Sequence, residues 1–120
     1  MSRWFTIDEA RALVPEVHER AAQIIGLRSE LVLRRERLDG GAARERPEVK
    51  ALEARLHEAM EWFGEEGIQV KGWAPLLIDF PMRHRDRTVL LCWLENEPAL
   101  GWWHDEAHGF MGRRPLTELD

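Results

Sequence analysis

An apolar stripe with helical spacing runs through the first half of the chain and constrains the fold most. Thr6 and Glu9 have the spacing of a capping box, which predicts that a helix begins there. Pro15 lies inside the stripe and predicts a kink, and Gly40 and Gly41 predict the helix end. The stripe follows alternating steps of three and four residues, typical of a helix with one buried side. Its members are Ile7, Ala10, Val14, Val17, Ala21, Ile24, Leu31 and Leu38.

A second stripe of the same spacing predicts a shorter helix that begins near Pro47 and ends before Gly64 and Gly67. Its apolar positions are Val49, Leu52, Leu56, Ala59 and Phe63. Helices of roughly 32 and 19 residues, joined by a short connection, should pack as an antiparallel hairpin. The first would be about 20 Å longer. We therefore expect its uncovered apolar positions to be buried against another subunit or against the C-terminal part.

The last third of the chain contains short apolar runs typical of strands. Leu76–Phe80 forms one run, which Pro81 should end, and a polar connector follows. Thr88–Leu94 is a second predicted strand, Glu95–Pro98 has the composition of a turn, and Ala99–Trp103 is the third predicted strand.

These patterns together predict an α+β fold. A long antiparallel helical hairpin, with its first helix kinked near Pro15, would occupy residues 1–70. A small three-stranded antiparallel β-meander and an irregular tail would occupy residues 71–120. Both parts would belong to a single domain, residues 1–120.

Composition excludes several classes of protein. A net charge of −5 argues against nucleic-acid binding, which needs clustered Lys and Arg. Every apolar run is far shorter than the ~20 residues of a membrane span. Charges stand where a signal peptide would need an apolar core, so we expect a cytoplasmic protein. A single Cys excludes an internal disulfide framework.

The two ends of the chain carry recognisable motifs. They are Phe5–Ala10 with Leu13–Pro15, Ile78–Pro81, Leu91–Trp93, Glu97–Pro98, Trp103–Asp105 and Gly109–Arg113. In this order they resemble a bacterial family of uncharacterised proteins, domain of unknown function 2203. Two positions depart from the family's pattern. Asn96 stands where Gly is usual, and Ala107 stands where an acidic residue is common. The resemblance implies a small cytosolic protein and names no activity.

The polar residues inside these C-terminal motifs form a candidate ligand or metal site, because thiolate, imidazole and carboxylate groups all bind Zn²⁺. Its residues are Asp79, Cys92, Glu97, His104 and Arg113, with Trp93, Trp103 and Phe110 as lining aromatics. His104 and His108 also have an H-x₃-H spacing that suits zinc. Against this, a Cys within an apolar strand is usually a small buried hydrophobe.

Successive side chains of a strand point to opposite faces of the sheet, so the length of the loop between the two strands decides whether Cys92 and His104 lie on the same face. A two-residue turn between their strands puts them on opposite faces, and a three-residue loop puts them on one face, two positions apart. Both loop lengths stay open. A nucleophilic set of Cys92, His104 and an acid is the enzymatic alternative. We expect Arg113 to pair with Asp79 rather than to bind an anionic ligand.

Four of the six tryptophans, Trp73, Trp93, Trp102 and Trp103, lie in the C-terminal part. Trp102 and Trp103 are adjacent, so on a strand they should point to opposite faces. We expect one of them to pack on the helices. The other should meet a second subunit or line a pocket.

Two functions follow from these patterns, of which the sequence favours the first. The first is a non-catalytic interaction module that forms a homodimer through its helices and needs no cofactor. The second is a protein with a C-terminal Cys/His/carboxylate site for a small ligand, zinc or another divalent transition metal, with enzymatic activity left open. The sequence names neither a protein partner nor a small-molecule partner, and we expect neither nucleic acid nor membrane binding.

Overall fold

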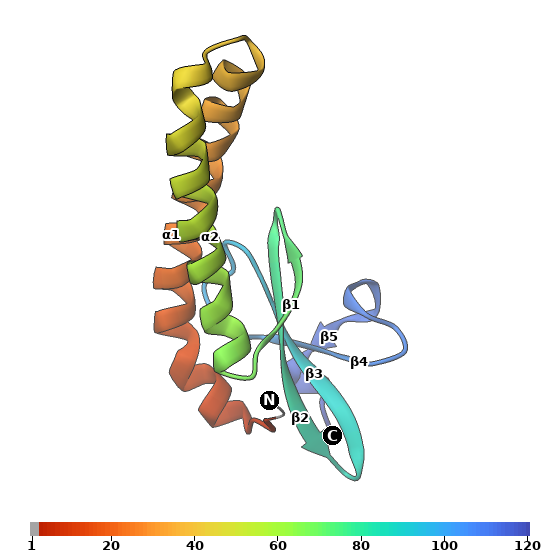
Figure 1. The fold of residues 1–120 in the computed structure, drawn as a ribbon. Coiled ribbons are helices and arrows are strands. Elements are labelled where there is room, and N and C mark those ends of the chain that lie inside the picture. The colour runs from red at the N-terminus through yellow and green to blue at the C-terminus, as the bar shows by residue number, and fades with distance from the viewer. Residues whose placement is uncertain (1–2) are drawn as a thin grey trace. The chain divides into compact units, whose positions relative to one another are not determined.

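The computed structural model describes residues 3–120 and has an α+β fold (Figure 1). The fold class predicted from the sequence is confirmed. The helices are α1 (Ile7–Asp39) and α2 (Arg46–Glu65), with the short 3₁₀ helices η1 (Ala43–Glu45), η2 (Phe110–Gly112) and η3 (Leu116–Glu118). The strands are β1 (Gln69–Trp73), β2 (Leu76–His84), β3 (Arg87–Leu94), β4 (Trp102–Asp105) and β5 (Arg114–Pro115).

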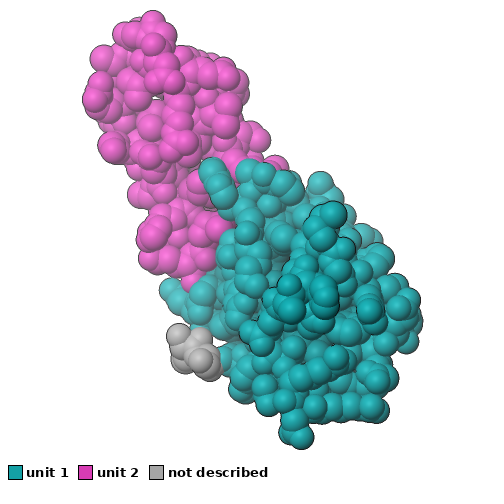
Figure 2. Space-filling view, turned by 90° about the vertical axis from the view of Figure 1, so that its right-hand side faces the viewer, with its two compact units in different colours: residues 1–17, 63–120 teal, residues 18–62 magenta. Residues whose placement is uncertain are grey.

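The chain divides into two compact units, which are coloured separately in Figure 2. Residues 18–62 form one unit and contain most of both helices. Residues 1–17 and 63–120 form the other and contain the sheet together with the first turns of α1.

Residues 18–62 contain two antiparallel helices joined by η1. Arg35 pairs with Glu53 at 3.0 Å near the connection, while Arg20 lies over the Trp62 ring at 5.2 Å at the other end. Most apolar positions of both predicted stripes are buried in this unit, whereas Leu38 at the end of the first stripe is half-buried. The buried positions are Ala21, Ile24, Leu31, Val49, Leu52, Leu56 and Ala59.

The sheet has five antiparallel strands in the order β1-β2-β3-β4-β5, so the predicted three-stranded meander is wrong in strand number. The sequence pattern missed β1 because Val70 is its single aliphatic residue, and its five positions alternate between exposed and half-buried. β5 is too short, at two residues, to produce a pattern.

β2 continues through Pro81 and ends at His84. The sequence pattern instead predicts that this strand ends at Pro81. β1 pairs with β2 only as far as Asp79, so Pro81 lies where the outer edge of β2 has no neighbouring strand. Its carbonyl faces that edge and accepts a hydrogen bond from the Phe5 amide at 2.7 Å. A residue's N–H and C=O point to the same side of a strand, so the missing N–H of Pro81 costs no bond to β3.

The turns also differ from the prediction. Arg85 and Asp86 form a two-residue turn between β2 and β3, with φ of 52° and 62°. The connection between β3 and β4 covers residues 95–101, so the third predicted strand begins at Trp102 rather than at Ala99. Glu95 stabilises this connection by accepting a hydrogen bond from the Leu76 amide at 2.8 Å.

The beginning of α1 packs with the sheet. The capping box is confirmed, because the Thr6 amide donates to Glu9 at 2.9 Å and the Glu9 amide donates to Thr6 Oγ1 at 3.0 Å. Phe5 contacts Phe80 edge to face at 5.2 Å. Ala10, Val14 and Val17 are buried and belong to the same compact unit as the sheet, while Ile7 is half-buried. α1 continues through Pro15, and the kink there stays a prediction.

Candidate functional site

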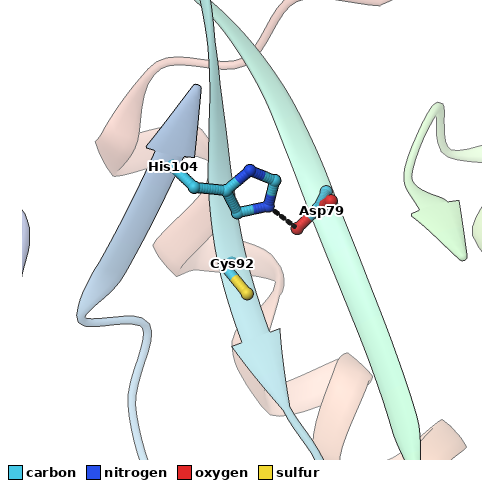
Figure 3. Close-up of side chains that lie close together, drawn as sticks. All are labelled: Asp79, Cys92 and His104. Atoms are coloured by element: carbon cyan, nitrogen blue, oxygen red, sulfur yellow. Dashed lines mark hydrogen bonds and ion pairs between the residues drawn. The ribbon is translucent and has the colours of Figure 1, made fainter. Parts of the chain in front are cut away.

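Asp79, Cys92 and His104 lie side by side on β2, β3 and β4 (Figure 3). Asp79 pairs directly with Cys92, and His104 pairs with Leu90, two residues along β3 from Cys92. This register places all three side chains on one face of the sheet. One ligand atom from each residue lies within 4.8 Å of the other two. Cys92 and His104 therefore share a face, but both predicted loop lengths are wrong, because the connection between β3 and β4 covers residues 95–101.

The His104 ring is held by two hydrogen bonds. Nδ1 lies 2.8 Å from the backbone carbonyl of Asp105, and Nε2 lies 3.1 Å from Asp79 Oδ1. A carbonyl oxygen can only accept, so Nδ1 carries a proton and donates it to Asp105. Nε2 is then the nitrogen that faces Asp79, as the dashed line in Figure 3 shows.

All three side chains are removed from solvent: Cys92 is 0% exposed, Asp79 1% and His104 3%. Burial alone lowers the pKa of His104. The hydrogen bonds to Asp79, Cys92 and the Asp105 carbonyl outweigh burial and raise that pKa to about 10. In the protein without a metal ion, His104 is therefore a buried imidazolium paired with Asp79.

We expect the stability of the metal-free protein to fall at alkaline pH. The folded state binds the His104 proton more tightly than the unfolded chain, where the pKa is near 6.5. This stabilisation is fully present below pH 6.5 and is lost as the pH rises towards about 10. One proton changes the free energy of unfolding by at most about 1.4 kcal/mol per pH unit.

Urea unfolding of EDTA-treated wild type and His104→Gln at several pH values measures how steeply the free energy of unfolding changes with pH. The variant should lack this pH dependence, and His57→Gln, which alters an exposed histidine on α2, should keep it. Equal slopes in wild type and His104→Gln would contradict the assignment.

Positive groups flank the cluster of Asp79, Cys92 and His104. Lys71 Nζ on β1 donates to Asp79 Oδ2 at 3.1 Å, which leaves Oδ1 directed at His104. The Arg113 guanidinium lies 3.9 Å from Cys92 Sγ. Cys92 therefore has the acidic neighbour Asp79 on one side and the basic groups of His104 and Arg113 beside it as well.

Glu97 and Arg113 form a separate pair next to the cluster. Two Arg113 nitrogens donate to the two Glu97 carboxylate oxygens at 2.6 and 3.1 Å. The Arg113 guanidinium also lies over the rings of Trp102 and Phe110, at 4.4 and 4.7 Å. The predicted partner of Arg113 is therefore wrong: Arg113 pairs with Glu97, while Asp79 bonds Lys71 and His104. Glu97 also accepts a hydrogen bond from the Leu94 amide at 2.7 Å, so it organises the turn.

The remaining predicted site residues lie elsewhere. Trp93 and Trp103 alternate with Cys92, Trp102 and His104 along their strands and so belong to the other face of the sheet. Phe110 lies against Arg113. His108 is exposed and bonds the Asp105 carboxylate, which leaves it outside the cluster despite the H-x₃-H spacing.

The chain was compared with known proteins. The family model of an uncharacterized conserved protein, DUF2203, matches residues 3–116. The chain belongs to the DUF2203 family. The comparisons found no matching curated protein and no matching solved structure. In the described part of this DUF2203 chain, no helix is long and apolar enough to cross a membrane.

Sequence reasoning missed two parts of the site in this DUF2203 chain. Lys71 lies on β1, the strand that had no recognisable pattern, so its contact with Asp79 was not foreseen. The Asp105 carbonyl that orients His104 is a backbone group and carries no residue-specific signal.

Proposed function

We propose that this chain binds one divalent transition metal ion, zinc foremost, through Asp79, Cys92 and His104. The observation that carries the proposal is the approach of three different donor atoms on one face of the sheet, within 4.8 Å of one another. Carboxylate oxygen, thiolate sulfur and imidazole nitrogen are all established zinc ligands.

The distances are close to what coordination requires. A tetrahedral zinc ion with ligands at about 2.0–2.3 Å holds neighbouring ligand atoms roughly 3.3–3.8 Å apart. Asp79 Oδ1 and His104 Nε2 are 3.1 Å apart, and the remaining separations need to shrink by about 1 Å at most. Rotamer adjustment of Cys92 and Asp79 is the movement that could supply this change.

The surroundings support the same chemistry. Histidine ligands usually donate their second ring nitrogen to a carbonyl or carboxylate, which fixes the tautomer. Here Nδ1 donates to the Asp105 carbonyl. In the neutral form of this tautomer, Nε2 directs a lone pair at Asp79 Oδ1, so two acceptors face each other. A proton or a metal cation between them relieves this repulsion, and a metal would displace the proton.

The nucleophilic alternative fits less well. A base in a Cys–His–acid set uses one ring nitrogen for the thiol and the other for the orienting acid. In this chain Asp79 bonds Nε2, and a backbone carbonyl bonds Nδ1. Cys92 is also 0% exposed, so a substrate has no access to its sulfur.

Metal content tests the proposal directly. Protein purified without a His-tag and incubated with zinc should retain about one ion per chain after gel filtration, measured by elemental analysis. Cys92→Ser and His104→Gln should retain almost none. His108→Gln is the matched control, because His108 is an exposed histidine near the site, and it should bind like wild type.

Cobalt substitution adds a spectroscopic measurement. Co²⁺ bound to wild type should produce a thiolate-to-metal charge-transfer band that Cys92→Ser lacks. Wild-type protein that keeps its fold but retains neither zinc nor cobalt would overturn the proposal.

Self-association through the helices is our second candidate. The sequence favours it through an uncovered overhang of α1, but Ala10, Val14 and Val17 near the start of that helix are already buried within one chain. The remaining observation is that Val32 and Leu33 on α1 are 52% and 55% exposed. Light scattering at micromolar concentration should give a dimer mass, and Val32→Glu with Leu33→Glu should give a monomer. A monomeric wild type would overturn this candidate.

A further inference from the structure

A second possible site lies on the other face of β4. A cavity of about 200 Å³ is lined by Arg87, Trp103, Asp105, His108, Gly112 and Arg114. Trp103 and Asp105 alternate with His104 along β4, so their side chains point away from the cluster of Asp79, Cys92 and His104. The cavity lies within the unit that contains the sheet.

Trp103 is the unusual residue of this cavity. It is 5% exposed, and its indole N–H has no hydrogen-bond partner among the residues that the structure describes. It is the one such buried side-chain atom found in that part of the chain. The indole nitrogen can only donate, and a buried donor without an acceptor is costly. A ligand that accepts a hydrogen bond would remove this cost.

Two guanidinium groups accompany this donor. Arg87 and Arg114 lie over the Trp103 ring, at 5.4 and 5.8 Å from its centre. Arginine carries only donors, and its planar fork matches the oxygens of a phosphate or carboxylate. Two charged donor side chains thus line one small space, and Trp103, whose enclosed indole N–H has no acceptor among the described residues, lines it with them.

The acidic residues nearby do not neutralise these cations fully. The Asp105 carboxylate already accepts bonds from the His108 amide at 2.9 Å and from its ring at 2.7 Å. Asp120 lies 3.7 Å from Arg87, and both side chains are well exposed, so this pair is weak. One engaged carboxylate and two arginines leave the cavity wall positive.

Gly112 allows His108 to pack closely against this wall of the cavity. A Cβ atom added there would meet the Cβ of His108 at 2.6 Å, so a side chain at this position would force His108 to move. His108 is held in place by Asp105, which fixes this wall of the cavity.

We propose that this cavity binds a small oxyanion of the phosphate class, held by Arg87, Arg114 and the indole N–H of Trp103. The volume accommodates orthophosphate and leaves room for water or a small substituent. The site is independent of the proposed metal centre, since it uses different residues on the opposite face of β4.

Calorimetric titration with inorganic phosphate tests the proposal. The protein is first treated with EDTA, so that a bound metal cannot supply the anion site, and ionic strength is held constant with sodium chloride. We expect saturable binding of one phosphate per chain. Arg87→Gln and Arg114→Gln should each weaken it about tenfold or more, because each removes a charge-assisted contact.

Two further variants make the experiment specific. Trp103→Phe keeps an aromatic ring under the guanidiniums and removes only the donor, so it should weaken binding about threefold to tenfold. Arg55→Gln removes the same charge from an exposed position on α2 and should bind like wild type. Absence of saturable binding at phosphate concentrations of about 10 mM would overturn the proposal. Unchanged affinity in both arginine variants would also overturn it.

Discussion

Replacing His104 with alanine is expected to lower the free energy of unfolding of the metal-free protein by about 3–5 kcal/mol. His104 and Asp79 form an ion pair that is 3% and 1% exposed, at 3.1 Å. Removing the imidazolium leaves the Asp79 carboxylate buried, with Lys71 as its remaining charged partner. Urea unfolding of EDTA-treated protein, followed by circular dichroism, measures the change.

Two variants show whether the pair is responsible. His57→Ala alters an exposed histidine on α2 and should change the free energy of unfolding by less than about 0.5 kcal/mol. Asp79→Leu combined with His104→Leu replaces both partners by apolar groups and should recover much of the lost stability. A loss below about 1 kcal/mol in His104→Ala would mean that the pair contributes little.

The second large effect is expected at Arg113. Replacing it with alanine should lower the free energy of unfolding by about 2–4 kcal/mol. The change removes the two-pronged pair with Glu97, whose side chain is 18% exposed, and two aromatic contacts. Burial lowers the pKa of Arg113, but the bonds to Glu97 and Cys92 raise it overall, so the guanidinium stays charged.

A double-mutant cycle separates the ion pair from the aromatic contacts. Glu97→Ala, Arg113→Ala and the double variant should give a coupling energy above about 1 kcal/mol. Arg113→Lys keeps the charge but loses the planar fork, so it should recover less than half of the loss. Arg55→Ala, at an exposed position on α2, is the control for arginine removal in general. Additive effects of the two single variants would show that Glu97 and Arg113 act independently.

The helical half of the fold could be predicted because its buried apolar residues recur at steps of three and four residues. Ile24, Leu31 and Leu52 are apolar, correctly spaced and buried in the structure. β1 and β5 could not be predicted. β1 is half-exposed, and β5 is too short for a pattern.

The candidate site was predictable in composition but not in geometry. Asp79, Cys92 and His104 were all named, but whether Cys92 and His104 share a face depends on the length of the connection before β4. That connection covers residues 95–101, because Glu95 and Glu97 bond backbone amides of Leu76 and Leu94 within and beside the turn. Sequence also offered Arg113 two acidic partners of equal chemistry. Glu97 and Arg113 both lie in connections outside the strands, and the course of those connections brings Glu97 rather than Asp79 to Arg113.

The hydrogen bond from Phe5 to Pro81 has a consequence for solubility. Unpaired edges of β-sheets are templates on which other chains can add strands and aggregate. At Pro81 the outer edge of β2 carries no N–H, and its carbonyl already accepts the Phe5 amide. A second molecule therefore finds neither a donor nor an open acceptor at this position. The segment before α1 thus protects the sheet against intermolecular strand pairing.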